Sequence, residues 1–366
     1  MDSDVILVIV IATALAFDFT NGFHDTANAV ATTVSTRAMS PRAAVGLAAT
    51  LNFAGAFISL EVAATVANGI VDAGVINEMI VFGGLIGAIA WNLVTWYFGL
   101  PSSSSHALIG GVAGAAFVAE GPDAVLSDGL IEKVLIPALV APVLAFAAAG
   151  LTILLTYRIV GRLRPGPVNR GYRLGQVVSG SMLALAHGTN DAQKTMGIIA
   201  LALIAHGDLA AGADPPFWVV VSAATAIALG TYSGGWRIMK TMGSRIIKMD
   251  PAQGFAAQGG GAAVILTASH LGFPLSTTHT IAGSVMGAGA ARRLSAVRWG
   301  VAGNIAIAWV LTVPCAGAIG AAAFGASRIF GEGALGPVLV SLCVLTVIAG
   351  AFARRLQRGP ALTAEA

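Results

Sequence analysis

The sequence predicts an all-α membrane protein, a polytopic helix bundle of two inverted-topology repeats, each with a broken helix and a re-entrant helical hairpin. Of 366 residues, 56% are hydrophobic and only 10% are charged, whereas soluble domains carry about 25% charged residues. Several apolar runs reach the roughly 20 residues that cross a bilayer as a helix, and strand alternation is weak. Two pairs of related polar motifs interrupt these runs. The pairing indicates a duplicated chain.

Charged loops predict how the helices cross the membrane. Basic segments at 37–42, 158–173 and 237–248 alternate with acidic segments at 70–78 and 207–215. Lys and Arg favour the cytoplasmic side of a membrane. This pattern predicts a multi-pass protein of the cell membrane with its N-terminus outside and its C-terminus in the cytoplasm.

The same alternation divides the chain into four parts. Each half holds five membrane elements in the same order, and the second half runs in the opposite orientation. Inverted repeats of this kind are typical of transporters, whose substrate lies at the repeat interface near the midplane. The expected parts are a first repeat at 1–157, a cytoplasmic basic loop at 158–173, a second repeat at 174–330, and an extra membrane helix with a short tail at 331–366.

The first motif pair places charge inside apolar helices. In His187-Gly-Thr-Asn-Asp-Ala-Gln-Lys194, helical spacing brings His187, Asp191 and Lys194 to one face. Ionisable groups within a membrane mark functional sites. The segment 21–28 has the same spacing of a polar residue, a glycine, an aspartate and a second polar residue. The corresponding residues are Asn21 and His187, Gly22 and Gly188, Asp25 and Asp191, and Asn28 and Lys194.

The second motif pair is rich in hydrogen-bond donors. Gly-Leu-Pro-Ser-Ser-Ser-Ser-His at 99–106 resembles Gly-Phe-Pro-Leu-Ser-Thr-Thr-His at 272–279. Proline suits the first turn of a helix, whose free N–H groups and partial positive charge favour an anion. Two such helix starts predict a pocket for a tetrahedral oxyanion. A structural alternative is that the hydroxyls bond to helix carbonyls or pack as small residues.

The carboxylates of Asp25 and Asp191 would repel an anion, so they are expected to hold a coupling cation or proton beside it. The alternative is that they brace breaks in their own helices. Lys194 either neutralises Asp191 or occupies in the second half the place that a cation occupies in the first.

The segments GFHDTAN at 22–28 and AHGTNDAQKTMG at 186–197, with PSSSSH and PLSTTH, resemble the duplicated signatures of the inorganic phosphate transporter (PiT) family, bacterial type. The likeness spans nearly the whole chain. It implies a symporter of inorganic phosphate, carried alone or as a metal–phosphate complex, coupled to protons or sodium. The chain has Asn52 and Gln258 where animal members carry glutamates, which weakens any transfer of their sodium stoichiometry.

Residue by residue, the expected site has three groups. The coupling-ion group is Asp25, Asn28, Asp191 and Asn190, and the supporting group is His106, His279, His187 and Asn21. The substrate-binding group is Ser102, Ser103, Ser104, Ser105, Ser276, Thr277, Thr278 and Lys194.

The expected partners are inorganic phosphate, a coupling cation and the lipid bilayer, with a homodimer as the candidate assembly and no nucleic acid. We expect no catalytic residue, no resident metal and no cofactor. Protons are favoured over sodium as the coupling cation, because the resemblance is closest to bacterial members. Two other functions stay open at this point, namely transport of sulfate or a related oxyanion and a membrane-embedded phosphatase.

Overall fold

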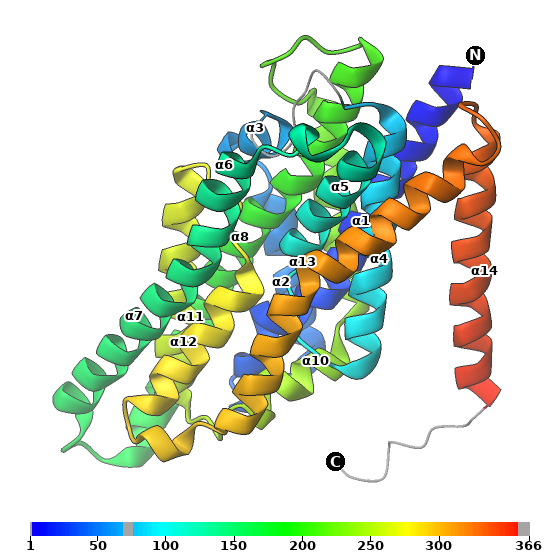
Figure 1. The fold of residues 1–366 in the computed structure, drawn as a ribbon. Coiled ribbons are helices and arrows are strands. Elements are labelled where there is room, and N and C mark those ends of the chain that lie inside the picture. Colours follow the sequence, from blue (N-terminus) through cyan, green and yellow to red (C-terminus); the bar gives the residue numbers. More distant parts are fainter. Residues whose placement is uncertain (1, 69–75, 358–366) are drawn as a thin grey trace.

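The computed structural model describes residues 2–68 and 76–357, in which the regular elements are helical and no β-strand occurs (Figure 1). Short 3₁₀ and π turns join some of the helices. The α-helices are α1 (Asp2–Ser35), α2 (Pro41–Gly55), α3 (Glu61–Asn68), α4 (Glu78–Phe98), α5 (Ser104–Glu120), α6 (Ser127–Leu130), α7 (Ile136–Val160), α8 (Pro165–His206), α9 (Phe217–Ser233), α10 (Trp236–Lys240), α11 (Pro251–His270), α12 (Thr277–Ala290), α13 (Trp299–Arg328) and α14 (Leu335–Gln357). The all-α prediction is confirmed.

Several helices are long and apolar enough to cross a membrane. Within the described residues, four segments pass by length and composition, namely Ser3–Ser35, Glu78–Phe98, Ser127–Val160 and Trp299–Arg328. A fifth span forms if α9 and the segment Trp236–Arg245, which are bent by 60° at their junction, are taken together. Large apolar side chains such as Leu139 and Val310 are about three-quarters exposed on the outside of the bundle. The chain is therefore a multi-pass membrane protein.

The helices of the two halves pack in a reciprocal way. α1 lies against α9, and α8 lies against α2. Hairpin 1, formed by α4, residues 99–103 and α5, packs on α13 from the other half. Hairpin 2, formed by α11, residues 271–276 and α12, packs on α7 from the first half. Each half thus completes the other, and α1 and α8 cross between the two hairpins.

Two motif glycines allow close contacts between these helices. A Cβ at Gly22 would meet the Ile227 carbonyl of α9, and a Cβ at Gly188 would meet the Asn52 carbonyl of α2. Small residues at helix crossings let backbones approach in membrane proteins. These glycines therefore bring the motif segments of α1 and α8 to the centre of the bundle.

The structure differs from the expectations at several junctions. The basic loop expected at 158–173 is reduced to 161–164, because α7 continues to Val160 and α8 begins at Pro165. α1 and α8 are helical throughout, so Asp25 and Asp191 do not brace breaks in their own helices. The interruptions lie instead at the hairpin tips and between α2 and α3 and between α9 and α10.

The extra helix expected near the C-terminus is α14, which runs along the edge of the bundle and packs on α13 and α1 (Figure 1). Most of the acidic segment expected at 70–78, and the tail at 359–366, lie outside the described residues.

Candidate functional site

The tips of the two hairpins meet the motif segments of α1 and α8 in the bundle interior. Every side chain expected to bind or support a ligand is at most 4% exposed. Burying this many polar groups is costly unless they are hydrogen-bonded to one another or to a ligand. Their partners therefore indicate what each side chain does.

Asp191 on α8 lies in a dense set of polar contacts. Its Oδ1 is 2.5 Å from Lys194 Nζ, and its Oδ2 is 3.0 Å from His187 Nε2. Thr277, at the start of α12, donates a hydrogen bond of 3.2 Å to the same Oδ2. The face predicted from the spacing of His187, Asp191 and Lys194 is therefore formed, and hairpin 2 contacts it.

Asp25 on α1 has a matching connection to hairpin 2. Thr278 donates a 3.1 Å hydrogen bond to Asp25 Oδ1, and Asn28 Nδ2 donates one of 2.8 Å to the Thr278 hydroxyl. The neighbouring His24 Nδ1 lies 2.8 Å from the same Oδ1. Consecutive threonines of one helix start thus bond to carboxylates from the two halves of the chain.

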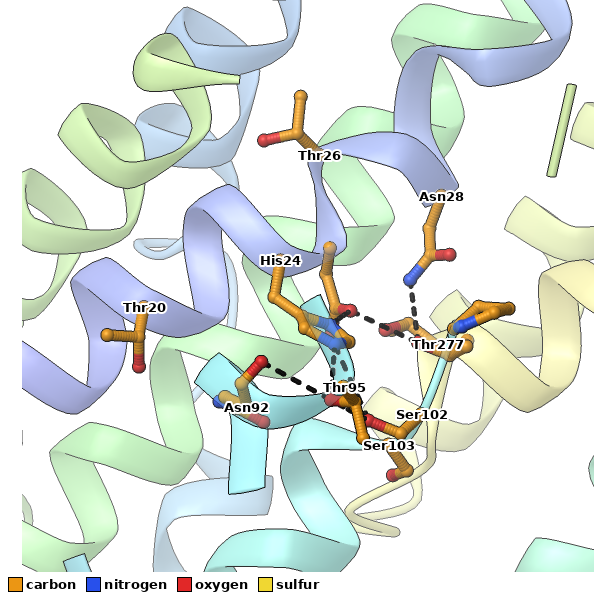
Figure 2. A network of polar contacts seen from close by, with 12 residues as sticks. Thr20, His24, Thr26, Asn28, Asn92, Thr95, Ser102, Ser103 and Thr277 are labelled. Atoms are coloured by element: carbon orange, nitrogen blue, oxygen red, sulfur yellow. Dashed lines mark hydrogen bonds and ion pairs between the residues drawn. The ribbon is translucent and has the colours of Figure 1, made fainter. Parts of the chain in front are cut away.

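The same His24 ring also contacts hairpin 1, and Figure 2 shows it beside Thr95 and Ser102. Its Nε2 lies 3.1 Å from Thr95 Oγ1 of α4 and 3.4 Å from Ser102 Oγ, and Ser102 in turn donates to Thr95 over 2.8 Å. Motif analysis identified Ser102 and missed both His24 and Thr95. The sequence offered two indications of them. His24 stands next to Asp25 in the first motif, and Thr95 is a hydroxyl residue near the end of an apolar segment.

Lys194 is the buried cation that joins the two hairpins. Besides Asp191, its ammonium donates to Ser105 Oγ of hairpin 1 over 2.5 Å and to the Leu275 carbonyl of hairpin 2 over 2.8 Å. A carboxylate, a hydroxyl and a carbonyl oxygen thus surround the ammonium. Oxygen ligands of these kinds also hold hard metal cations. Of the two roles left open for Lys194, neutralising Asp191 fits these contacts directly.

The hydroxyls of the hairpin tips have different roles. Ser103 and Ser276 are N-caps that accept from the backbone N–H of His106 and His279. Ser104 is 1% exposed and its hydroxyl has no partner among the described residues. Ser104 is therefore the hydroxyl that stays available to a ligand.

The prolines of the hairpin motifs do not start the helices as expected. Pro101 and Pro274 lie in the connecting segments, three residues before the first residue of α5 and of α12. The N-terminal turns that face the site are therefore formed by hydroxyl residues, whose N–H groups remain available as donors.

The motif histidines meet between the hairpins. The rings of His106 and His279 are edge to face with centroids 4.7 Å apart, and His279 stacks on Trp309 of α13 at 3.9 Å. These ring contacts join the tips of the two hairpins.

Three further predicted residues lie around the carboxylates. His187 Nδ1 is 3.3 Å from Asn52 Oδ1, so α2 orients the ring that faces Asp191. Asn190 donates instead to Ser269 Oγ and to the Phe273 carbonyl, and so ties α8 to hairpin 2. Asn21 is 1% exposed, with its Oδ1 unbonded among the described residues.

A cation could be held where the two halves meet. One ligand atom each from Asp25, His187 and Asp191 lies within 4.8 Å of the other two, and all three side chains are buried. Carboxylate oxygens suit hard cations and protons. With the unpartnered Ser104 hydroxyl and the positive charge of Lys194, the site thus offers a donor and a charge for an anion beside acceptors for a cation.

One buried acid was missed by the motif analysis. Asp18 lies seven residues before Asp25, two turns away on α1, and is 0% exposed. The signal was available in the sequence, because an aspartate in an apolar run at helical spacing from a motif acid belongs to the same face.

Comparison with known proteins identifies the family. Residues 21–320, which contain both motif pairs, match the phosphate transporter family. The chain belongs to the phosphate transporter family. The members of this family transport inorganic phosphate and are not enzymes, so the membrane phosphatase is excluded.

Several relatives of this phosphate transporter family member align over most of its length. It is 49% identical to a probable low-affinity inorganic phosphate transporter of Mycobacterium tuberculosis (strain ATCC 25618 / H37Rv), over 97% of this chain and 85% of the relative. Similarly named proteins of Rhizobium meliloti and Bacillus subtilis are 50% and 44% identical, over 88% and 87% of this chain and 96% of each relative.

The fold has a solved counterpart. A structure described as the sodium-dependent phosphate transporter superposes with a TM-score of 0.81 at 25% identity, covering 88% of this chain and 99% of that one. The fold of this phosphate transporter family member is thereby shown, and a coupling cation is supported in general terms.

Proposed function

We propose that this protein is a secondary active symporter of inorganic phosphate, driven by a cation gradient in which protons are favoured over sodium. One observation carries the proposal. The buried carboxylates Asp25 and Asp191 come from the two motif helices and are joined through Thr277 and Thr278 at one helix start. Acceptors for a cation therefore lie against the first turn of α12, and the backbone N–H groups of such a turn favour an anion.

Counting charge supports coupling to cations. Asp25, Asp191 and a phosphate of charge about −1 to −2 together carry a total of about −3 to −4, against the single cation Lys194. Uncompensated charge in a membrane interior costs several kcal/mol. Cations or protons that enter with phosphate would remove this excess, and their release would lower phosphate affinity on the other side.

Phosphate suits the proposed site better than sulfate does. At neutral pH phosphate still carries a hydrogen, so it donates to an acceptor such as Asp25 or Asp191, whereas sulfate has no hydrogen to donate. The hydroxyl of Ser104 would supply a donor to its oxygens, and Lys194, whose three N–H groups are bonded to Asp191, Ser105 and Leu275, would attract the anion by its charge. Competition by sulfate in a phosphate-uptake assay measures this preference.

The proposal has a direct test. Purified protein is reconstituted into vesicles, and uptake of radiolabelled phosphate is measured with a proton gradient alone and a sodium gradient alone. Accumulation with the proton gradient supports the proposal. Accumulation driven only by sodium would support symport but with sodium as the coupling ion. Equal uptake without either gradient would refute coupling. An added arm with Mg²⁺ tests carriage as a metal–phosphate complex, which predicts faster uptake.

The wider architecture is part of the same proposal. We propose that 1–157 and 174–330 are inverted repeats in the plasma membrane, with the N-terminus outside and the C-terminus in the cytoplasm. The reciprocal packing of α1 on α9 and of α8 on α2 supports the duplication. A homodimer is the proposed assembly, and its mass in a lipid disc tests it.

A further inference from the structure

Asp18 is a buried carboxylate that the proposed phosphate and cation contacts do not use. Its side chain is completely buried in α1, and neither carboxylate oxygen has a hydrogen-bond donor among the described residues. A buried charge without partners is among the most expensive arrangements in a protein. The carboxylate must therefore acquire a compensating partner in the functioning molecule.

Two polar groups that act on Asp18 also lack hydrogen-bond partners among the described residues. Asn21 on α1 and Thr195 on α8 are the polar side chains that act on Asp18, although neither contact has hydrogen-bond geometry. The Asn21 Oδ1 and the Thr195 hydroxyl are themselves buried and unbonded among the described residues. Asp18, Asn21 and Thr195 thus all keep unused hydrogen-bonding capacity among the described residues.

We propose that Asp18, with Asn21 and Thr195, is a proton-binding site separate from the Asp25 and Asp191 carboxylates. One added proton satisfies the whole group. A protonated Asp18 can donate its O–H to Asn21 Oδ1, and the Thr195 hydroxyl can donate to the other Asp18 oxygen. The charge disappears at the same time. The proposal rests on the proposed symport function and adds a coupling site to it.

The group suits a proton better than a metal ion. It offers one carboxylate, one amide oxygen and one hydroxyl, whereas hard cations such as Mg²⁺ and Ca²⁺ take about six or more oxygen ligands. Among the described residues, Asp18 is also absent from the cluster of possible metal-binding side chains, which consists of Asp25, His187 and Asp191.

The charges that face Asp18 connect it to phosphate. From α8, Asp191 repels negative charge on Asp18 and Lys194 attracts it. Of the other titratable groups of the site, His24 and Asp25 follow Asp18 on the same helix, and His187 on α8 contacts Asp191. An anion bound beside Lys194 offsets the lysine charge, so it favours protonation of Asp18. By reciprocity, a proton on Asp18 strengthens phosphate binding.

The test is to measure phosphate affinity of the purified protein between pH 5 and pH 9 in Asp18→Asn and in the wild type. Each proton taken up with phosphate changes the dissociation constant by about tenfold per pH unit. We expect the wild-type dependence to be steeper than that of Asp18→Asn by up to this amount. Asp208→Asn, at an exposed carboxylate after α8, is the matched control and should behave as wild type.

Infrared spectroscopy gives a second readout that does not depend on transport. The wild type should show a band of a protonated carboxylic acid that is lost in Asp18→Asn and kept in Asp208→Asn. If Asp18→Asn does not fold, Thr195→Val serves instead, because removing a donor to the carboxylate should keep the acid protonated to higher pH. An unchanged band in Asp18→Asn, or an unchanged midpoint in Thr195→Val, would overturn the proposal.

These outcomes are separable from failure of the proposed function. If phosphate accumulation in wild-type vesicles depends on neither gradient, the symport is refuted. The infrared band of Asp18 would then belong to a structural acid, and the coupling role of Asp18 would be overturned as well. If accumulation follows the proton gradient while the pH dependence of Asp18→Asn matches that of the wild type, only the Asp18 assignment fails.

Discussion

Asp25 and Asp191 come from opposite halves of the chain, and each places a carboxylate oxygen within 4.8 Å of the other and of a His187 ring nitrogen. Like charges this close in a buried site cannot both stay ionised without compensation. Lys194 is bonded to Asp191 and not to Asp25. The pair therefore has capacity for one further positive charge, and this capacity is the basis of the proposed coupling.

Removing either charge should stop concentrative uptake. Asp25→Asn and Asp191→Asn keep side-chain size, so we expect folded protein that no longer accumulates phosphate against a gradient. Accumulation in vesicles is the measurement, with size-exclusion profiles to check folding and Asp208→Asn as the control. Wild-type accumulation by both variants would contradict the role of the pair.

Lys194 should be important for stability as well as for transport. Lys194→Met removes the partner of a buried carboxylate together with the contacts to Ser105 and Leu275. Breaking a buried pair from one side costs about 3–5 kcal/mol. We expect a clear fall in the thermal unfolding temperature in detergent.

The double variant separates charge from packing. Adding Asp191→Asn to Lys194→Met removes the orphaned carboxylate, so part of the lost stability should return. A double variant less stable than Lys194→Met alone would mean that the side chains act by shape and not by charge.

Adjacent serines at the tip of hairpin 1 should respond differently to the same change. Ser103 caps α5, so Ser103→Ala should cost about 1 kcal/mol of stability. Ser104 has no partner among the described residues, so Ser104→Ala should leave stability unchanged and weaken phosphate binding by about 1 kcal/mol or more. Titration of phosphate and thermal unfolding on both variants test this contrast, and unchanged binding in Ser104→Ala would assign that hydroxyl a structural role.

The sequence predicted the hydroxyl-rich helix starts and the charged face of α8, because both depend on local patterns. It did not separate Ser103 from Ser104, since the role of each depends on the residue at which α5 begins. It also did not show that the Asn190 amide N–H group bonds to Ser269 and Phe273 of hairpin 2, while its Oδ1 stays unbonded among the described residues. Such partners are set by tertiary packing, which a motif does not encode.

The helix crossing at Gly22 should be intolerant of a methyl group. Gly22→Ala would push against the backbone of α9 at Ile227, and overpacking of this kind costs about 1–3 kcal/mol. Gly46→Ala in α2 is the matched control, because its Cβ would meet nothing within 4 Å and should stabilise the helix by about 0.5–1 kcal/mol. Unfolding temperatures in detergent compare the two, and equal effects would contradict the close crossing.

Single-cysteine labelling tests the proposed orientation. After replacement of Cys315 and Cys343, cysteines at 37–42, 161–164 and 237–248 should be protected from an impermeant reagent outside the cell, and those at 207–215 should react. Labelling of 161–164 from outside would contradict the inverted arrangement.

The all-α class was the most predictable property, because hydropathy acts over whole segments. The continuity of the long motif helices α1 and α8 was less predictable. Expected breaks at Asp25 and Asp191 are absent, since α1 and α8 keep their hydrogen bonds while the polar groups are satisfied by side chains of the hairpins. Asp18 lies outside both motif pairs, so the motif comparison missed it, although its helical spacing from Asp25 is visible in the sequence.

The number of cations moved with each phosphate tests the central claim most directly. In vesicles with a fixed phosphate gradient, the opposing proton gradient is varied until net phosphate flux is zero, and the null point gives the ratio. The charge at the site predicts about two or more positive charges per phosphate. A null point that depends on the phosphate gradient alone, unaffected by protons or by sodium, would contradict it.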